Sequence, residues 1–262
     1  MKQTTERIEE IKNNGYNLDF GDVFNHAFEN YKKIALYAGL VLFVFSVIIG
    51  VLAFGIITSI FGIAALDKTF FESFRLENLS GIFIVVYLLI GALLAALLGP
   101  FTAGFLKMAD CAEKDNEFHV STFFEYYKAP YFKEIFTATL LIGLASSGIS
   151  TLVELASIEL VGMLVSIIIS FLTFLTIPLI VFGNLQAIDA IKTSFSIVLK
   201  QAWILILLLF VSFIASMVGF IGCCIGIFFT IPFMYSMHYA IYCAIVGIET
   251  DSEIEEIGSN ME

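Results

Sequence analysis

Long apolar segments alternate with short polar ones along this chain. Four segments contain no Asp, Glu, Lys or Arg: residues 34–66, 81–106, 160–188 and 201–248. Crossing the ~30 Å hydrocarbon layer takes about 20 apolar residues, whereas a run of about 10–14 is typical of a buried helix in a soluble protein. These runs also lack the polar stripe that a soluble helix keeps on its solvent face. The pattern therefore predicts an all-α, polytopic transmembrane helical bundle.

Six spans account for these runs. The expected spans are residues 36–58, 81–103, 134–155, 160–182, 203–222 and 227–248. The first apolar run is too long for one perpendicular helix, so we expect it to end near Gly55 or Gly62. The phenylalanines that follow it would lie at the outer interface; they are Phe70, Phe71 and Phe74. The expected domains are a polar N-terminal segment (1–16), a six-helix transmembrane domain (17–248) and an acidic C-terminal tail (249–262).

The basic residues predict the orientation of the spans. Of the 13 Lys and Arg residues, only Lys68 and Arg75 fall on one side of a six-span chain, and the other 11 share the side of the N-terminus. Because Lys and Arg accumulate in cytoplasmic connections, we expect both termini in the cytoplasm. The first 33 residues are polar and charged, so we expect no cleavable signal peptide. These features predict a multi-pass protein of a bacterial cytoplasmic (inner) membrane.

The composition agrees with a membrane protein, and the net charge limits the kinds of binding partner that we expect. Hydrophobic residues make up 59% of the chain and charged residues 14%, against about half and a quarter in soluble domains. The net charge of −11 argues against nucleic acid as a partner and gives no reason to expect strong attraction to anionic headgroups. We therefore expect membrane lipids as partners. A protein partner would bind through the cytoplasmic amphipathic helices or the acidic tail.

Similar segments precede the first, third and fifth spans. They are residues 21–33, 121–133 and 188–200. Each segment ends in a lysine. The second residue of each segment is able to cap the N-terminus of a helix; these residues are Asp22, Thr122 and Asp189. Apolar positions at helical spacing before a basic residue are typical of an amphipathic helix on the cytoplasmic surface. The sequence therefore predicts three tandem units, each a surface helix followed by a transmembrane hairpin.

Prolines and small residues recur in these spans. The second span of each hairpin carries one proline, and we expect Pro100, Pro178 and Pro232 to bend their helices. Small residues recur every four positions in four spans: Gly91, Ala95 and Gly99; Gly143, Ser147 and Thr151; Gly162, Ser166 and Ser170; and Ser212 with Ser216. Such rows let helix backbones approach closely. They predict a compact bundle.

Several of these motifs resemble a known bacterial group. They are the surface segments that end in Lys, the run Gly99-Pro100-Phe101-Thr102-Ala103-Gly104, the Ile177-Pro178 run leading to residues 187–195, and Ile231-Pro232. Over roughly residues 17–248 the chain is similar to uncharacterised six-span membrane proteins related to the membrane domain of glycerophosphoryl diester phosphodiesterases. The resemblance implies a helical membrane domain. We expect the phosphodiesterase catalytic domain to be absent, so the resemblance implies no activity.

Some members of that group carry a carotenoid-oxygenase label, which the histidines allow us to examine. Oxygenases of that type need four histidines around iron, and this chain has three: His26, His119 and His238. The first two fall in cytoplasmic segments and the third falls in a span, so this chemistry is disfavoured. P-loop, G-x-S-x-G and H-E-x-x-H motifs are also missing from the sequence. We expect no cofactor and no metal.

The most polar feature within a predicted span lies in the sixth. Tyr235, His238, Tyr239 and Tyr242 are spaced i, i+3, i+4 and i+7, which places them on one helix face. An ionisable residue inside a span suggests a functional site, because burying it unpaired is costly. His238 is therefore a candidate ligand contact or proton relay. The alternative is structural: His238 bonds to a neighbouring helix, and the tyrosines lie near the interface.

Three further features have ordinary explanations that we favour. Asp189 and Lys192 are spaced to pair on the third surface helix or to anchor it to the bundle, but we favour a solvated helix face as their explanation. The adjacent cysteines Cys223 and Cys224 fit two small apolar residues at a helix end better than a metal or redox pair. The residues after position 248, rich in Glu and Asp, fit a solvated tail.

Three function classes stay open. We favour a non-enzymatic integral membrane protein that organises membrane or binds lipids or a protein partner. A small-molecule or lipid transporter is the first alternative, although the spans offer no Asp, Glu, Lys or Arg for a coupling ion. A membrane-embedded enzyme is the second. A polar cavity at His238 would favour transport or lipid handling, whereas a dry, packed interior would favour a scaffold.

Overall fold

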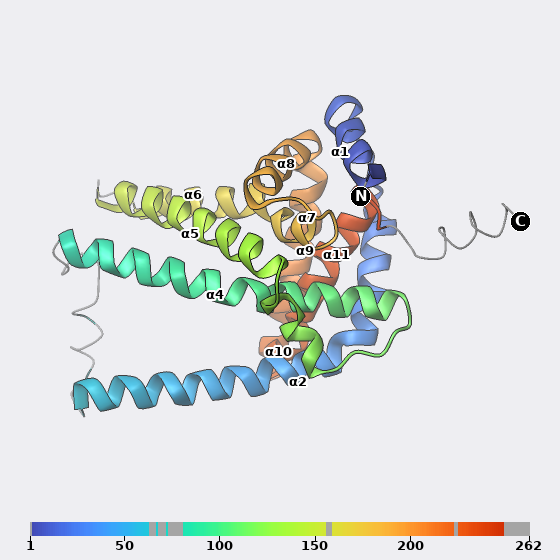
Figure 1. Ribbon diagram of the computed structural model, residues 1–262. Coiled ribbons are helices and arrows are strands. Elements are labelled where there is room, and N and C mark those ends of the chain that lie inside the picture. Colours follow the sequence, from blue (N-terminus) through green and yellow to red (C-terminus); the bar gives the residue numbers. More distant parts are fainter. Residues whose placement is uncertain are drawn as a thin grey trace, which may run out of the picture.

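The computed structural model describes residues 2–62, 67, 72, 81–155, 159–222 and 225–248, and in these ranges the chain is helical and contains no strand (Figure 1). The elements are α1 (Lys2–Asn14), α2 (Phe20–Phe61), α4 (Gly81–Glu113), η3 (Val120–Tyr127), α5 (Tyr131–Leu155), α6 (Glu159–Thr173), α7 (Thr176–Val181), α8 (Ala187–Lys200), α9 (Ala202–Met217), η4 (Val218–Gly222), α10 (Gly226–Thr230) and α11 (Pro232–Ile245), where η marks a 3-10 helix. The all-α prediction is confirmed.

Six helical segments are long and apolar enough to cross a membrane. They are Phe20–Phe61, Gly81–Glu113, Tyr131–Glu154, Leu160–Val181, Ala202–Gly222 and Gly226–Ile245. The first ends as expected at Gly62, whose positive φ of 66° favours glycine after a helix C-terminus. Phe70, Phe71 and Phe74, together with Cys223, Cys224 and the acidic tail, lie outside the described residues.

The three surface segments begin in the same register but end differently. Their N-cap residues are Asp19, His119 and Gln186. The prediction that Asp22, Thr122 and Asp189 are N-caps is therefore wrong by one turn; each lies three positions later, inside the first turn. The first segment continues unbroken into its span, and the third ends at Lys200 before α9. The second is a 3-10 helix rather than the expected α-helix, and α5 starts only at Tyr131.

The 3-10 helix η3 lies directly against α4. A Cβ added at Gly104 would be 2.6 Å from the Cα of Phe123, so only glycine permits this approach. The Tyr127 hydroxyl donates a hydrogen bond to the carbonyl of Leu97 at 2.8 Å. Burial raises the pKa of the neighbouring Tyr126 phenol above its usual range, so this ring stays uncharged. The second surface segment is therefore packed onto a span instead of lying free on the surface.

A layer formed by α1 and α8 covers one end of the bundle (Figure 1). The Tyr16 hydroxyl donates to the carbonyl of Ile197 at 3.0 Å, and Lys12 Nζ donates to Thr193 Oγ1 at 3.0 Å. Burial raises the pKa of Tyr16 well above its usual range. At the start of α8, the backbone N–H of Ala187 donates to Glu134 Oε2 at 2.9 Å. These bonds join α8 to α1 and α5.

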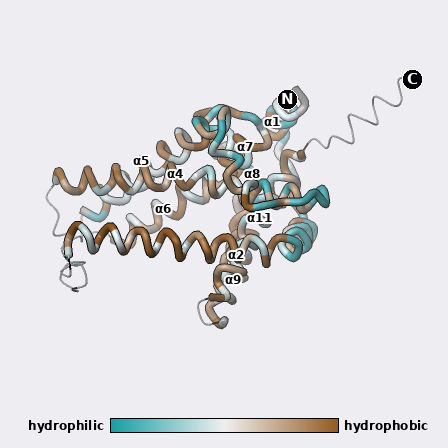
Figure 2. The backbone as a smooth tube through the Cα atoms, turned by 60° about the horizontal axis from the view of Figure 1, so that its bottom comes forward, coloured by the Kyte–Doolittle hydropathy of each residue, from teal (hydrophilic) through white to brown (hydrophobic). Residues whose placement is uncertain are grey.

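The third hairpin takes a different direction from the first two. In Figure 1 the helices α2, α4, α5 and α6 extend towards the same side, and in both views α9 runs transverse to the part of α2 that extends towards that side (Figure 2). The far end of this hairpin meets α2 near its middle: the rings of Phe228 and Phe43 are 5.4 Å apart. A Cβ added at Gly39 would lie 2.5 Å from the Phe229 ring. The three predicted hairpins are therefore not placed equivalently.

The rows of small residues pack only in part as predicted. In α4 the buried row is Ala92, Ala96, Gly99 and Ala103, whereas Gly91 and Ala95 are exposed, so the predicted row is correct only at Gly99. On α5, Gly143 lies against Ala92, while Ser147 is half-buried and its hydroxyl bonds back to the carbonyl of Gly143. Gly162 and Ser166 of α6 both meet Ser150, whose hydroxyl is 2.5 Å from that of Ser166 and donates to the Gly162 carbonyl at 2.8 Å.

The prolines occupy two kinds of position. Pro100 is buried inside the continuous helix α4. Pro178 lies in α7, directly after the break between α6 and α7, and Pro232 is the first residue of α11, directly after α10. Proline lacks the N–H that an interior helix position requires, but it is tolerated in a first turn. Pro178 and Pro232 therefore mark interruptions of their spans.

Candidate functional site: a polar cluster and two hollows beside His238

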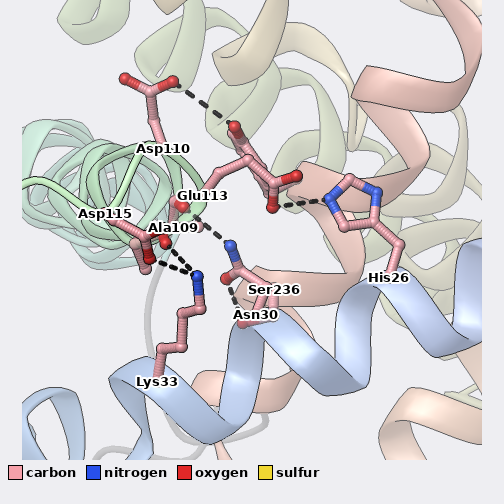
Figure 3. A network of polar contacts seen from close by, with 10 residues as sticks. His26, Asn30, Lys33, Ala109, Asp110, Glu113, Asp115 and Ser236 are labelled. Carbon is pink, nitrogen blue, oxygen red and sulfur yellow. Dashed lines mark hydrogen bonds and ion pairs between the residues drawn. The ribbon is translucent and has the colours of Figure 1, made fainter.

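A polar cluster joins α2, α4 and α11 at the end of the bundle that carries the charges (Figure 3). At its centre, the buried Asn30 of α2 donates to the carbonyl of Ala109 at 2.7 Å and accepts from the hydroxyl of Ser236 at 3.1 Å. Asn30 is 2% exposed and Ser236 is fully buried. A buried side-chain amide that bonds in this way fixes the positions of three helices, since leaving it unpaired would be costly.

Asp110 is a buried carboxylate in the same cluster. It lies 3.3 Å from Nζ of Lys107, in the same helix, and 3.0 Å from Nζ of Lys114, which directly follows that helix. The hydroxyl of Tyr239, from α11, is 3.4 Å from Asp110 Oδ1. Two cations and a hydroxyl offset the cost of burying this charge.

Two more residues of α2 bind the C-terminal end of α4 and the turn that follows it. His26 Nε2 is 2.9 Å from Glu113 Oε2. Lys33 Nζ donates to the carbonyl of Ala112 at 2.9 Å and to Asp115 Oδ1 at 2.6 Å. A lysine at the last carbonyls of a helix satisfies groups that have no partner within the helix. The cluster thus fixes the N-terminal part of α2, the C-terminal part of α4 and the helix α11 relative to one another.

An apolar hollow of about 500 Å³ lies between α6, α9 and α11. Its walls include Ile167, Phe171, Ile206, Leu209, Phe210 and His238. Ile167 and Phe210 are also exposed on the outside of the helices. The hollow therefore opens on the apolar surface that faces lipid in a membrane-spanning bundle.

A second hollow, the hydroxyl hollow, lies on the other side of His238. It measures about 330 Å³, and α4, α5, α6, α7 and α11 contribute to its walls. Several of its lining residues carry hydroxyl groups: Thr102, Thr139, Thr173, Thr176, Ser170 and Tyr235. The two hollows share four lining residues, which are Ser170, Phe174, Met234 and His238. His238 thus stands at the junction of an apolar hollow and one whose walls carry several hydroxyl groups.

The four polar residues predicted to share one face of α11 divide into two pairs. Tyr235 and His238 line the hydroxyl hollow, and their rings are 6.5 Å apart. Tyr239 and Tyr242 are buried and pack against Phe182, with ring separations of 5.7 and 5.5 Å. Tyr239 belongs to the polar cluster through Asp110. The structure therefore brings only Tyr235 and His238 together at a hollow.

The three histidines lie apart. His26 pairs with Glu113, His119 caps η3 with its side chain largely exposed, and His238 contacts Phe174 and Tyr235. Within the described ranges no three His, Cys, Asp or Glu side chains come close enough to share a metal ion. Asp189 and Lys192 are both exposed, and no ion pair joins them.

Sequence patterns did not reveal the polar cluster. Its bonds between helices join residues 79 to 206 positions apart in the sequence, and most of its members belong to segments that resemble ordinary charged surface. One signal was present: Asn30 and Ser236 occupy positions on the apolar faces of their helices, where a polar residue needs a partner. The hollows had one signal as well, namely His238 in an otherwise uncharged span.

Comparisons with known proteins do not extend these observations. No family model, no curated protein and no solved structure matches the chain.

Proposed function

We propose that this chain is a non-enzymatic integral membrane protein that binds a lipid between α6, α9 and α11. The observation that carries the proposal is the apolar hollow beside His238, which opens on the lipid-facing surface of the bundle. A volume of about 500 Å³ falls in the range of about 300–1,000 Å³ that is usual for small-molecule sites. In a membrane, the acyl chains of the surrounding lipids can enter such a site directly from the bilayer.

The walls of the apolar hollow suit a hydrocarbon chain. They consist mostly of Ile, Leu, Phe and Met side chains, with Ser170, Ser212 and His238 as the polar exceptions. Within the membrane, the favourable free energy of binding does not come from removing apolar surface from water, since the surrounding lipid is already apolar. It comes from closer van der Waals contact with a shaped surface.

The proposed setting is a bacterial cytoplasmic membrane with both termini in the cytoplasm. The 11-to-2 distribution of Lys and Arg supports this orientation. The polar cluster would then lie at the cytoplasmic end, where Lys33 and Asp115 reach water. Relationship to the membrane domain of glycerophosphoryl diester phosphodiesterases is likewise a proposal; it rests on the motifs around Pro100, Pro178 and Pro232.

A transporter for a small uncharged solute is the second candidate. The hydroxyl hollow favours it, because hydroxyl groups and one imidazole inside a span can replace the water around a polar solute. The binding of lipid in the apolar hollow distinguishes the two candidates, since a solute transporter does not require it.

Lipid analysis of the purified protein tests the proposal. The wild-type protein, an Ile206→Trp variant and a Leu207→Trp variant are purified in detergent, washed extensively and analysed by native mass spectrometry for retained lipid. Ile206 lines the apolar hollow, whereas Leu207 does not, and the two side chains are 45% and 43% exposed. Tryptophan at position 206 fills part of the hollow, so we expect retained lipid to fall by about fivefold or more, the equivalent of a loss of ~1 kcal/mol.

The neighbouring substitution is the matched control. The Leu207→Trp protein should retain lipid at the wild-type level, because the added ring faces away from the hollow. Equal retention by the two variants would contradict the proposal, as would a wild-type protein that retains no lipid after washing.

A further inference from the structure

The hydroxyl hollow contains a buried polar atom that lacks a partner. Thr176 is fully buried, and its Oγ1 forms no hydrogen bond with any residue that the structure describes. Thr173, on the same wall, donates its hydroxyl to the carbonyl of Ile169 at 2.7 Å, and its oxygen can still accept. A buried hydroxyl without a partner costs free energy. A polar atom in the hollow that bonds to this hydroxyl, after a rotation of the Thr176 side chain, would recover that energy.

The walls of the hydroxyl hollow exclude a charged ligand group. None of the residues that line it is Asp, Glu, Lys or Arg. His238 contacts the rings of Phe174 and Tyr235, and it has no hydrogen-bond partner in the described part of the chain. An imidazole ring can donate from one nitrogen and accept at the other, and a threonine hydroxyl can do both. A phosphate or ammonium group would be buried here unpaired, whereas an alcohol finds donors and acceptors.

The two hollows are arranged for one amphiphilic molecule. They meet at Ser170, Phe174, Met234 and His238, so a chain in the apolar hollow can carry its polar end into the hydroxyl hollow. We propose that the hydroxyl hollow binds the head of an uncharged lipid with a free hydroxyl group, of the diacylglycerol class. This inference rests on the proposed function, because the acyl chain of the same lipid occupies the apolar hollow.

Competition between headgroups on the same acyl chains tests the inference. Purified protein is stripped of lipid with detergent and incubated with equal amounts of dioleoylglycerol and dioleoylphosphatidylglycerol, and native mass spectrometry measures the ratio of the two bound lipids. The wild-type protein should favour dioleoylglycerol. Thr176→Val removes the unpaired hydroxyl at nearly constant volume and should reduce this preference by about fivefold, the ratio that corresponds to a net hydrogen-bond contribution of ~1 kcal/mol.

A second threonine provides the control. Thr151 is also buried within a span but does not line either hollow, so Thr151→Val should keep the wild-type preference. Size-exclusion chromatography verifies that each variant stays monodisperse. Equal binding of the two lipids by the wild-type protein, or an unchanged preference in Thr176→Val, overturns the inference but leaves lipid binding intact. Failure to bind either lipid overturns the proposed function as well.

Discussion

In the first hairpin, α2 runs unbroken for 42 residues. Its C-terminal half, called the outer half because it is the half farther from the polar cluster, is not covered by other helices. From Ser46 to Gly62 every residue except Thr58 is exposed. In the third hairpin, the corresponding segments are divided into α9, η4, α10 and α11, and they fold back against the inner half of α2. The contact between Phe228 and Phe43 lies about 27 Å short of the end of α2, at 1.5 Å per residue.

The difference shows that a long apolar run determines that a helix is solvated by lipid, but does not determine which other helices it packs against. The outer half of α2 carries no charged residue and is mostly brown, with pale bands, in Figure 2, so lipid alone is sufficient to solvate it. The third hairpin carries small and hydroxyl side chains where helices meet, which allows it to pack. Because α9 lies transverse to the outer half of α2 in both views, these two segments cannot both follow the membrane normal.

The largest loss of stability is expected when a side chain is added at Gly39, where the first and third hairpins are in contact. A Cβ at this position would lie 2.5 Å from Phe229 Cδ1 and 2.9 Å from its Cα, and the backbone atom cannot move aside by rotating a side chain. Gly39→Val should therefore lower the free energy of unfolding by about 3 kcal/mol, near the upper end of typical overpacking costs. Unfolding in mixed micelles with increasing dodecyl sulfate, followed by circular dichroism, measures this change.

Gly50 provides the matched control in the outer half of the same helix. No atom lies within 4 Å of a Cβ added at Gly50, so Gly50→Val should leave the unfolding free energy nearly unchanged. Similar losses in the two variants would show that the third hairpin does not pack on α2 as described.

The sequence predicted elements more successfully than contacts. The length of the apolar runs predicted six apolar helices and an end of the first near Gly55 or Gly62, because the membrane sets the length of a span; the helix ends at Gly62. The packing row in α4 was misplaced by one residue, since Gly91 and Ala92 are both small and spacing alone cannot show which of them faces α5. His238 was identifiable as a polar residue in a span. The hollows beside it depend on side chains from helices that are far apart in sequence, and no local pattern records that arrangement.

A smaller effect is expected at Asn30, which joins the two hairpins at their inner ends. Asn30→Leu removes the bonds to the Ala109 carbonyl and to the Ser236 hydroxyl, and the hydroxyl is then left buried without its acceptor. The unfolding free energy should fall by about 2 kcal/mol. Asn25→Leu, an exposed position on the same helix, should change little.

A double variant separates the bond from the packing. If the loss comes from the unpaired Ser236 hydroxyl, then Asn30→Leu combined with Ser236→Ala should be more stable than the sum of the two single changes predicts, by roughly 1 kcal/mol. Strict additivity would show that the two side chains do not interact.

The smallest effect distinguishes a hydrogen bond between helices from one within a helix. Thr230 Oγ1 donates to the carbonyl of Ser216 at 2.7 Å and so connects the two arms of the third hairpin, whereas Thr58 in the outer half of α2 bonds only to carbonyls of its own helix. Thr230→Val should cost about 0.6 kcal/mol, the average for side-chain hydrogen bonds between membrane helices. Thr58→Val should cost nothing measurable, because its helix keeps every backbone bond. Equal costs would mean that the third hairpin is held no more firmly than the lipid-solvated half of α2, and the contrast between the two hairpins would then reduce to van der Waals packing at Gly39.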